Sequence, residues 1–294
     1  MKNNSSKLKK FSAVLCGVGV LCSGFALAGC GQEIVDIDSV QTLNEVLAGE
    51  NVEGKVLRLT NDLTLNTTLL VKNTITIDGQ GKYTIKADTT WEGKTLNLLS
   101  LEDTTARTLT LKNVTIDGND AVRCVYAKGS NTLKVNGATI TNGSRANTYA
   151  PGVFITEKAH FEMTSGKVTG NDYPESVTNK DAYEYVYSQD LWIGANATGK
   201  ISGGEIGNMF VNSNEYSSLN EENFLQVTVN GGKIENAYIE YAKETEKGTF
   251  GATLRYKSGE ITNLYVAQDN DGVAQKVEAL TKNTTYQGGK NYNA

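Results

Sequence analysis

The sequence predicts an all-β fold, a right-handed, single-stranded parallel β-helix (solenoid) with a short capping helix near its amino end. Two observations carry this prediction. Seven segments place a β-branched apolar residue two positions before Gly or Asn, and six of them are followed by an aromatic residue with apolar neighbours on both sides. The seven pairs are Ile77 and Gly79, Ile116 and Gly118, Ile140 and Asn142, Val168 and Gly170, Ile206 and Asn208, Ile234 and Asn236, and Ile261 and Asn263.

The Gly-or-Asn position predicts a sharp bend in every repeat. Both residue types tolerate positive φ, so we expect each repeat to be a strand, a left-handed one-residue turn and a second strand. The steps between repeats vary, from 39 residues between Ile77 and Ile116 to 24 between Ile116 and Ile140. Such variation excludes a left-handed solenoid with a strict six-residue period and favours the right-handed form.

The aromatic residues form a second repeated position. Each has apolar residues on both sides, as in Val125–Tyr126–Ala127. Because side chains alternate along a strand, the apolar neighbours are expected to face the core and the rings to face outward. Insertions of growing length (119–124, 143–152 and 171–190) precede the first three rings. These insertions are therefore expected at one corner of successive coils. The six rings are Tyr126, Phe154, Trp192, Phe210, Tyr238 and Tyr265.

Four segments organise the chain. Residues 1–29 are predicted to be a signal peptide, 30–51 a tether and capping helix, 52–267 the β-helix, and 268–294 a polar cap or frayed tail. Asp38 or Ser39 can N-cap the helix, whose apolar face comprises Val40, Leu43, Val46 and Leu47, and Gly49 ends it. No second globular domain is expected.

The amino-terminal segment predicts export. Lysines precede an apolar run from Phe11 to Ala28, which is the pattern of a secretory signal. The run ends in Leu27, Ala28, Gly29 and Cys30, which resembles the bacterial lipobox. This resemblance implies a diacylglycerol thioether on Cys30 and a membrane-anchored lipoprotein facing the exterior of a bacterial envelope. Cys124 is then the single free thiol, so no intramolecular disulfide forms.

Charge excludes one class of partner. The full chain has 28 basic and 33 acidic residues, and residues 1–29 hold four lysines and no acid, so the processed chain carries 24 minus 33, or −9. A phosphate polymer would be repelled by this charge, so nucleic acid is not an expected partner.

The β-helical repeats, typified by the run from Phe161 to Asn171, resemble the pectin-lyase-like superfamily, and more closely its non-enzymatic surface members. The resemblance covers about residues 52–267. It implies the fold. The enzymes of that superfamily use clustered Asp residues with a His and an Arg, or a Ca²⁺ site with an Arg or Lys base, and neither set is visible here.

Asp120 and Asp172 are the best catalytic candidates. Each follows the turn position and an Asn, with Arg123 and Arg145 nearby in the chain, and glycoside hydrolysis needs two carboxyl groups at a fixed separation. The alternative is ordinary turn chemistry. His160 alternates with Phe161 and is expected at the surface beside Glu162. No cofactor or metal site is predicted, apart from a Ca²⁺-loop fragment at 269–272 that lacks its closing Glu.

The ring column and the long insertion suggest a glycan site. Loop 171–190 combines Tyr183, Tyr185 and Tyr187 with acidic residues, and aromatic faces with polar groups bind sugars. With rings one interstrand distance apart, the column would form a long flat platform. The alternative is that stacked rings only stabilise the sheet. Three hypotheses follow: a non-catalytic, lipid-anchored adhesin or polysaccharide-binding protein, a carbohydrate-active enzyme (lyase or hydrolase), or a purely structural surface module. Oligomeric state is open.

Overall fold

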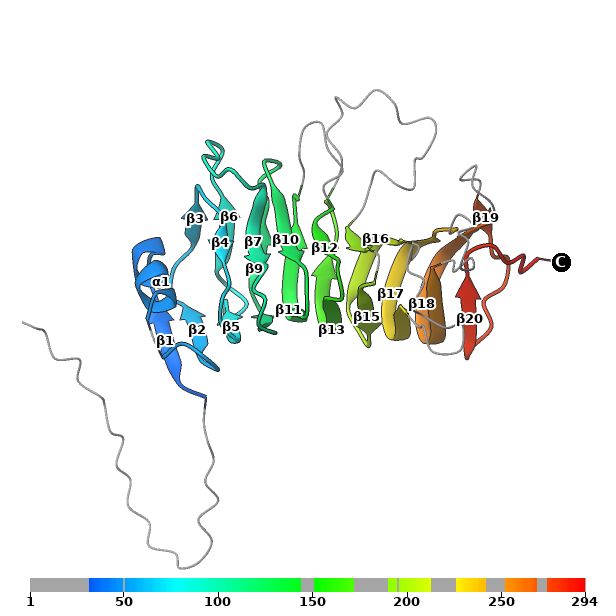
Figure 1. The fold of residues 1–294 in the computed structure, drawn as a ribbon, viewed down its shortest axis with the longest axis horizontal. Coiled ribbons are helices and arrows are strands. Elements are labelled where there is room, and N and C mark those ends of the chain that lie inside the picture. Colours follow the sequence, from blue (N-terminus) through cyan, green and yellow to red (C-terminus); the bar gives the residue numbers. More distant parts are fainter. Residues whose placement is uncertain are drawn as a thin grey trace, which may run out of the picture. The chain divides into compact units, whose positions relative to one another are not determined.

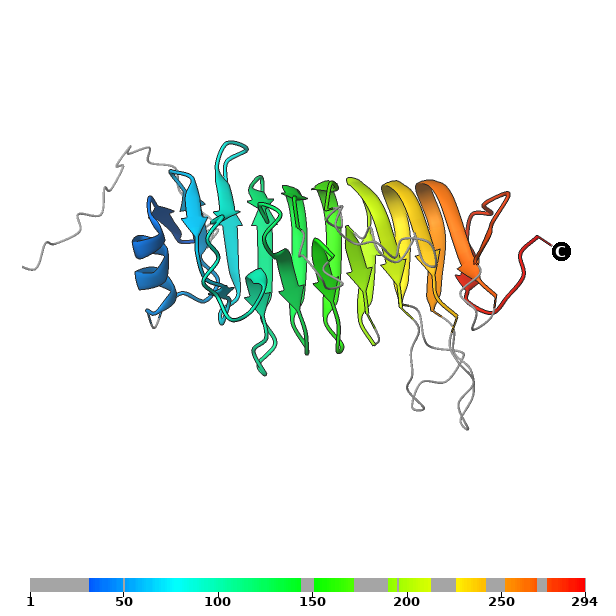
Figure 2. The same ribbon diagram turned by 90° about the horizontal axis from the view of Figure 1, so that it is seen from above.

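The computed structural model describes residues 32–49, 51–143, 151–171, 190–194, 196–212, 226–241, 252–268 and 274–293. The chain divides into Met1–Gly31 and Gln32–Ala294, and all described residues belong to the second unit. That unit is the parallel β-helix that the sequence predicts, with one helix and strands stacked coil upon coil (Figures 1 and 2).

Each full coil contributes strands to three faces, which we name the first, second and third faces in chain order. From β1 to β18, parallel pairing joins the strands of each coil to their equivalents in the next coil. The first face contains β1 (Ile34–Ile37), β2 (Val56–Leu59), β5 (Ile75–Asp78), β8 (Thr108–Lys112), β15 (Thr198–Ile201) and the first parts of β11 (Thr132–Thr141), β13 (His160–Val168), β17 (Val227–Ile239) and β18 (Thr253–Ala267). The second face contains β3 (Leu63–Leu65), β6 (Thr84–Ala87), β9 (Thr115–Asp117), the start of β16 (Glu205–Val211) and the later parts of β11, β13, β17 and β18. The third face contains β4 (Leu69–Leu70), β7 (Asn97–Leu101), β10 (Arg123–Ala127), β12 (Val153–Ile155), β14 (Leu191–Ile193) and the ends of β16, β17 and β18.

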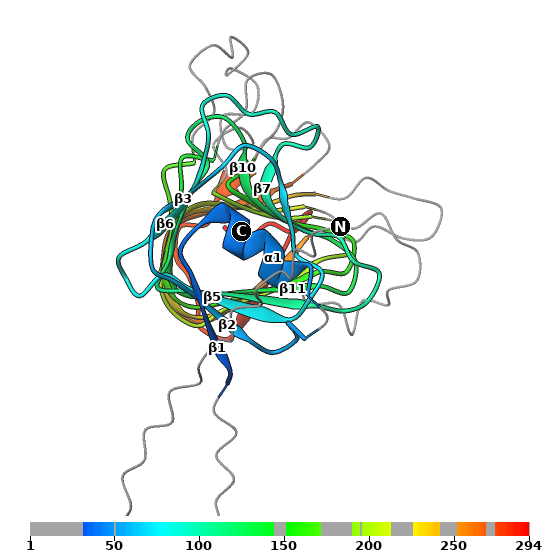
Figure 3. The ribbon, with the colours of Figure 1, turned by 90° about the vertical axis from the view of Figure 1, so that its left-hand side faces the viewer.

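Figure 3 shows the coils end-on, and the buried side chains of the core lie inside them. Inward residues stack in register along each face, as Leu57, Ile77 and Leu111 do on the first, and all three are fully buried. Leu, Ile and Val dominate these positions because a pleated strand presents alternate residues to one side, and branched apolar side chains pack well there. The continuous apolar interior is the main source of stability.

The amino end is capped as expected, but the solenoid starts earlier. Helix α1 (Val40–Leu47) is N-capped by Ser39, whose hydroxyl accepts a 3.1 Å hydrogen bond from the backbone N–H of Thr42. Residues 34–37, assigned from the sequence to a tether, instead form β1 and pair in parallel with β2. The described coils therefore begin at Ile34 and not at residue 52.

The carboxyl end is closed by two short strands of opposite direction. β19 (Ala274–Lys276) and β20 (Thr284–Gln287) both pair antiparallel with β18. Tyr286 is only 2% exposed and joins the core together with Val277. The described residues after Ala267 therefore form a packed cap and not a frayed tail.

The predicted left-handed turns are confirmed at two repeats and wrong at the others. Asn142 and Gly170 have φ of 53° and 71°. Asn208, Asn236 and Asn263 lie within β16, β17 and β18 and pair with one another in register. In those coils the positive φ occurs four residues earlier, at Gly204, Gly232 and Gly259, and it also occurs at Gly166.

Ile77 and Ile116, which the sequence repeats treat as equivalent, lie on different faces. Ile77 belongs to the first face, whereas Ile116 stacks between Ile85 and Ile140 on the second. Gly79 and Gly118 do not have positive φ; the left-handed residues follow them, at Gln80 and Gly81 and at Asn119 and Asp120. Gly79 follows β5 of the first face, whereas Gly118 follows β9 of the second, so the two glycines are not equivalent.

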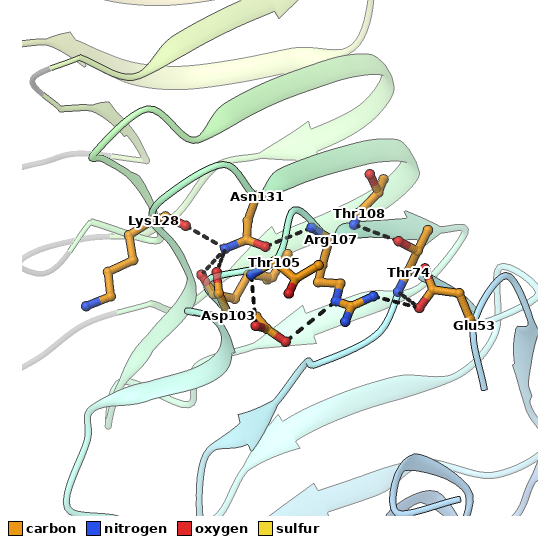
Figure 4. A network of polar contacts seen from close by, with 9 residues as sticks. Glu53, Thr74, Asp103, Thr105, Arg107, Thr108, Lys128 and Asn131 are labelled. Atoms are coloured by element: carbon orange, nitrogen blue, oxygen red, sulfur yellow. Dashed lines mark hydrogen bonds and ion pairs between the residues drawn. The ribbon is translucent and has the colours of Figure 1, made fainter. Parts of the chain in front are cut away.

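Charged and polar residues fix the outer surface and the corners. On the first and second faces, ion pairs link adjacent coils, including Lys134 with Glu162 at 2.9 Å and Lys167 with Glu205 at 2.8 Å. Asn131 lies at the corner leading from the third to the first face, in the polar network of Figure 4, and is fully buried. Its amide donates to the backbone oxygens of Lys128 and Asp103 and accepts from the N–H of Arg107, so one side chain holds three loop segments.

Candidate functional site

The third face carries the predicted aromatic column. Tyr126 pairs with Phe154, and the register continues without a break through the remaining rings. Ring centroids are 5.6 Å apart for Tyr126 and Phe154, and between 5.0 and 5.3 Å apart for the next three pairs. The column therefore comprises all six expected rings, in the order Tyr126, Phe154, Trp192, Phe210, Tyr238 and Tyr265.

The rings face away from the core. Their strand neighbours, such as Val153 and Ile155 beside Phe154, are fully buried in the interior. The predicted division into inward apolar residues and outward rings is confirmed.

The predicted flat platform is wrong. Adjacent rings are inclined by 47° (Tyr126 and Phe154), 38° (Phe154 and Trp192) and 86° (Trp192 and Phe210), and only Phe210 and Tyr238 are nearly parallel, at 14°. Rings held about 5 Å apart by the sheet turn to edge-to-face or offset positions, since these avoid the repulsion of aligned π-faces. The outer surface of the column is consequently ridged.

Exposure divides the column into two parts. Phe210 and Tyr238 are 2% and 6% exposed and pack with Ala267 into a small cluster of their own. Ala274 of β19 packs against the same cluster. Tyr126, Phe154 and Trp192 are half-buried, and so is Tyr265 at the carboxyl end.

A cation sits at the half-buried part. The guanidinium carbon of Arg123 lies 5.0 Å from the ring centre of Phe154 and 5.5 Å from that of Tyr126, within the range of cation–π attraction. Its Nη1 donates a 2.9 Å hydrogen bond to the side-chain oxygen of Asn97. Burial raises the pKa of Tyr126, and the charges of Lys128, Glu157 and Glu102 also act on that hydroxyl.

Asp120 is exposed and follows β9 with φ of 55°; its backbone N–H donates to the oxygen of Asn142. Its intended partner Asp172 and the nearby Arg145 lie outside the described residues, as do Tyr183, Tyr185, Tyr187, residues 269–272 and Cys30. The described ends of the insertions do share one corner, since each leads from the second to the third face.

His160 is half-buried at the outside of β13, as alternation requires. Its Nδ1 lies 2.8 Å from the hydroxyl of Thr198. Burial lowers the pKa of the imidazole, although the nearby Glu162 acts in the opposite direction. Cys124 is fully buried, with its thiol 3.2 Å from the backbone oxygen of Thr141, and burial raises its pKa far above the usual value.

Sequence reasoning missed a polar cluster at the corner before the third face. Asp190 is 3% exposed and accepts hydrogen bonds from the backbone and side-chain nitrogens of Asn171 at 3.0 and 2.9 Å, and from the backbone of Asn208 at 2.7 Å. An amide ladder follows, in which Asn236 donates to Asn208 and Asn263 donates to Asn236. The three Asn residues of the ladder occupy one repeated position in the sequence, where Asn also suits a left-handed turn.

No protein-family profile, no curated protein and no solved structure matches this chain. Within the described ranges, no group of three or more His, Cys, Asp or Glu residues is arranged to hold a metal ion. In the same ranges, no helix has the length and apolarity needed to cross a membrane.

Proposed function

We propose that this chain is a non-catalytic, surface-exposed β-helix protein that binds polysaccharide through the third face of its solenoid. The observation that carries the proposal is the unbroken register of six outward rings on one face. Outward aromatic side chains expose apolar surface that water disfavours, whereas the C–H face of a sugar ring covers such surface well.

The contrast between faces supports this choice. On the first and second faces, outward charges pair across coils, as Lys112 does with Asp78 at 2.9 Å and Lys167 with Glu205 at 2.8 Å. On the third face, rings occupy the equivalent outward positions. Polar groups that could hydrogen-bond sugar hydroxyls border them, including the partly exposed pair Lys128 and Glu102.

We also propose that the protein is anchored to the bacterial envelope through lipidated Cys30. The support is the lipobox-like run that ends at this residue. Acyl chains contribute about 0.8 kcal/mol per buried CH₂, so two or three chains anchor a protein firmly. Metabolic labelling with a fatty-acid analogue should label the wild type and not Cys30→Ala; equal labelling would contradict the anchor.

A glycan array probed with residues 31–294 tests the binding function. The wild type should bind at least one polysaccharide, and Trp192→Ala should weaken that binding by roughly tenfold or more. Tyr83→Ala is the matched control, because Tyr83 is a half-buried aromatic at a different corner, where its hydroxyl accepts a hydrogen bond from Lys82. Assays for reducing ends and unsaturated products run on the same samples, and product formation would favour the enzyme instead.

A further inference from the structure

The aromatic column has a sharply bounded accessible part, which limits what it can bind. Tyr126, Phe154 and Trp192 are half-buried, whereas Phe210 and Tyr238, the next two rings, are 2% and 6% exposed. In the coil before Tyr126, the equivalent outward position is taken by Ser100, which is fully buried. The accessible stretch therefore spans three rings, or two interstrand spacings of about 4.8 Å each.

The described charges that act on Tyr126, at one end of this stretch, balance. Arg123 and Lys128 contribute two positive charges, and Glu102 and Glu157 contribute two negative charges, all close enough to act on the hydroxyl of Tyr126. Lys128 and Glu102 are also paired with one another at 3.6 Å. Among the described residues around Tyr126, neither sign of charge is in excess to attract a uronate, a phosphate or an amino sugar, so this end of the stretch complements an uncharged ring.

The inclination of the rings favours a single polysaccharide chain over a crystalline polysaccharide surface. Tyr126 and Phe154 differ in plane by 47°, and Phe154 and Trp192 by 38°. A crystalline polysaccharide surface is flat and could touch only the edges of such rings. A single chain can rotate about its glycosidic bonds and bring successive rings against differently inclined faces.

Building on the proposed function, we infer that Tyr126, Phe154 and Trp192 form a short subsite for about three units of a soluble, uncharged hexopyranose chain, and that Phe210 and Tyr238 are packing residues outside it. The chain runs along the solenoid axis, because the three rings are stacked in that direction.

The experiment uses affinity electrophoresis and calorimetry with a neutral β-1,4-linked glucan and its oligosaccharides, from the disaccharide to the hexasaccharide. Affinity should rise to the trisaccharide and then level off, and it should be the same in about 0.05 and 0.5 M salt, because no ion pair is screened. Phe154→Ala should weaken binding roughly tenfold or more, whereas Tyr238→Ala should change it by less than about twofold and lower stability.

The outcomes distinguish failure of the three-ring subsite from failure of the proposed polysaccharide binding. If affinity keeps rising to the hexasaccharide, or Tyr238→Ala loses binding while it unfolds like the wild type, the three-ring subsite is wrong and polysaccharide binding stands. Binding only to an acidic polysaccharide, lost at high salt, contradicts the neutral ligand and leaves the face assigned. Failure of the wild type to bind any neutral or acidic glycan overturns the proposed function itself.

Discussion

The side-chain nitrogen of Asn236 donates a hydrogen bond of 2.8 Å to the side-chain oxygen of Asn208 in the preceding coil. Asn263 repeats the arrangement one coil later, so three amides form a ladder along the solenoid. Each coil is thereby held in register at a position where the backbone is extended. The ladder accounts for Asn at this position without any left-handed turn.

The ladder predicts which substitution at Asn236 lowers the free energy of unfolding more. Asn236→Val should cost about 1 to 2 kcal/mol, because two hydrogen bonds are lost. Asn236→Gly should cost more, since Gly adds roughly 0.5 to 1 kcal/mol of conformational entropy in a strand. Urea denaturation measures both variants.

Asn142 supplies the matched control, because its φ is 53°. There the order should reverse, with Gly tolerated better than Val, since a β-branched residue is strained in the left-handed region. The same ranking at both positions would show that the ladder does not decide the preference at Asn236.

His160 should make stability depend on pH. Its pKa is lowered by burial, so the unfolded chain binds the proton first. Stability should be constant above about pH 7 and should decline as the pH falls below the unfolded value of about 6.5, until the folded pKa is reached. His160→Thr, which matches its neighbours Thr132 and Thr198 in the same column, should remove this dependence. Parallel pH profiles for the two proteins would argue against it, and NMR of the chain's one histidine reports the pKa directly.

Replacing the carboxylate of Asp190 by an amide should destabilise the fold. Its carboxylate accepts three hydrogen bonds from N–H groups of Asn171 and Asn208. Asp190→Asn would replace one of the two acceptor oxygens by an NH₂ group facing either Asn171 or Asn208, and should cost about 2 to 4 kcal/mol in the free energy of unfolding. Glu205→Gln, at an exposed ion pair with Lys167, should change it by less than about 1 kcal/mol. Similar losses for both would mean that Asp190 contributes only its charge.

Trp192 should contribute to stability through its neighbours in the column. Its ring lies 5.0 Å from Phe154 and 5.3 Å, edge-on, from Phe210. Trp192→Ala should cost about 2 to 4 kcal/mol, and Trp192→Phe should retain most of that. In a Trp91→Phe background, acrylamide should quench Trp192 partly, as a half-buried indole requires; a fully protected Trp192 would contradict its exposure.

Strand alternation made the aromatic column predictable. Val153 and Ile155 had to share one side, which left Phe154 on the other, and stacking of equal repeats then aligned the rings. Strand alternation does not predict the tilt or the burial of each ring. The planes depend on contacts between neighbouring rings, and the burial of Tyr238 depends in part on Ala274 from a later strand.

The Asn ladder was missed because two physical causes select the same residue type. Asn suits a left-handed turn at Asn142 and an amide ladder at Asn236, and the sequence alone does not separate them. Asp190 was missed for a related reason. A carboxylate beside an insertion usually faces water, and its burial follows only from the return of the chain to Asn171.

The reversed strands β19 and β20 close the edge of the sheet at the carboxyl end of the solenoid. A stack of parallel coils has an open edge that a second solenoid could extend, adding rungs indefinitely into a fibre. Here the edge of β18 is taken on two faces by strands running in the opposite direction. A copy arriving with its own β1 would meet hydrogen-bonding groups of the wrong polarity for parallel addition. The parallel ladder thus stops at β18 on both of these faces.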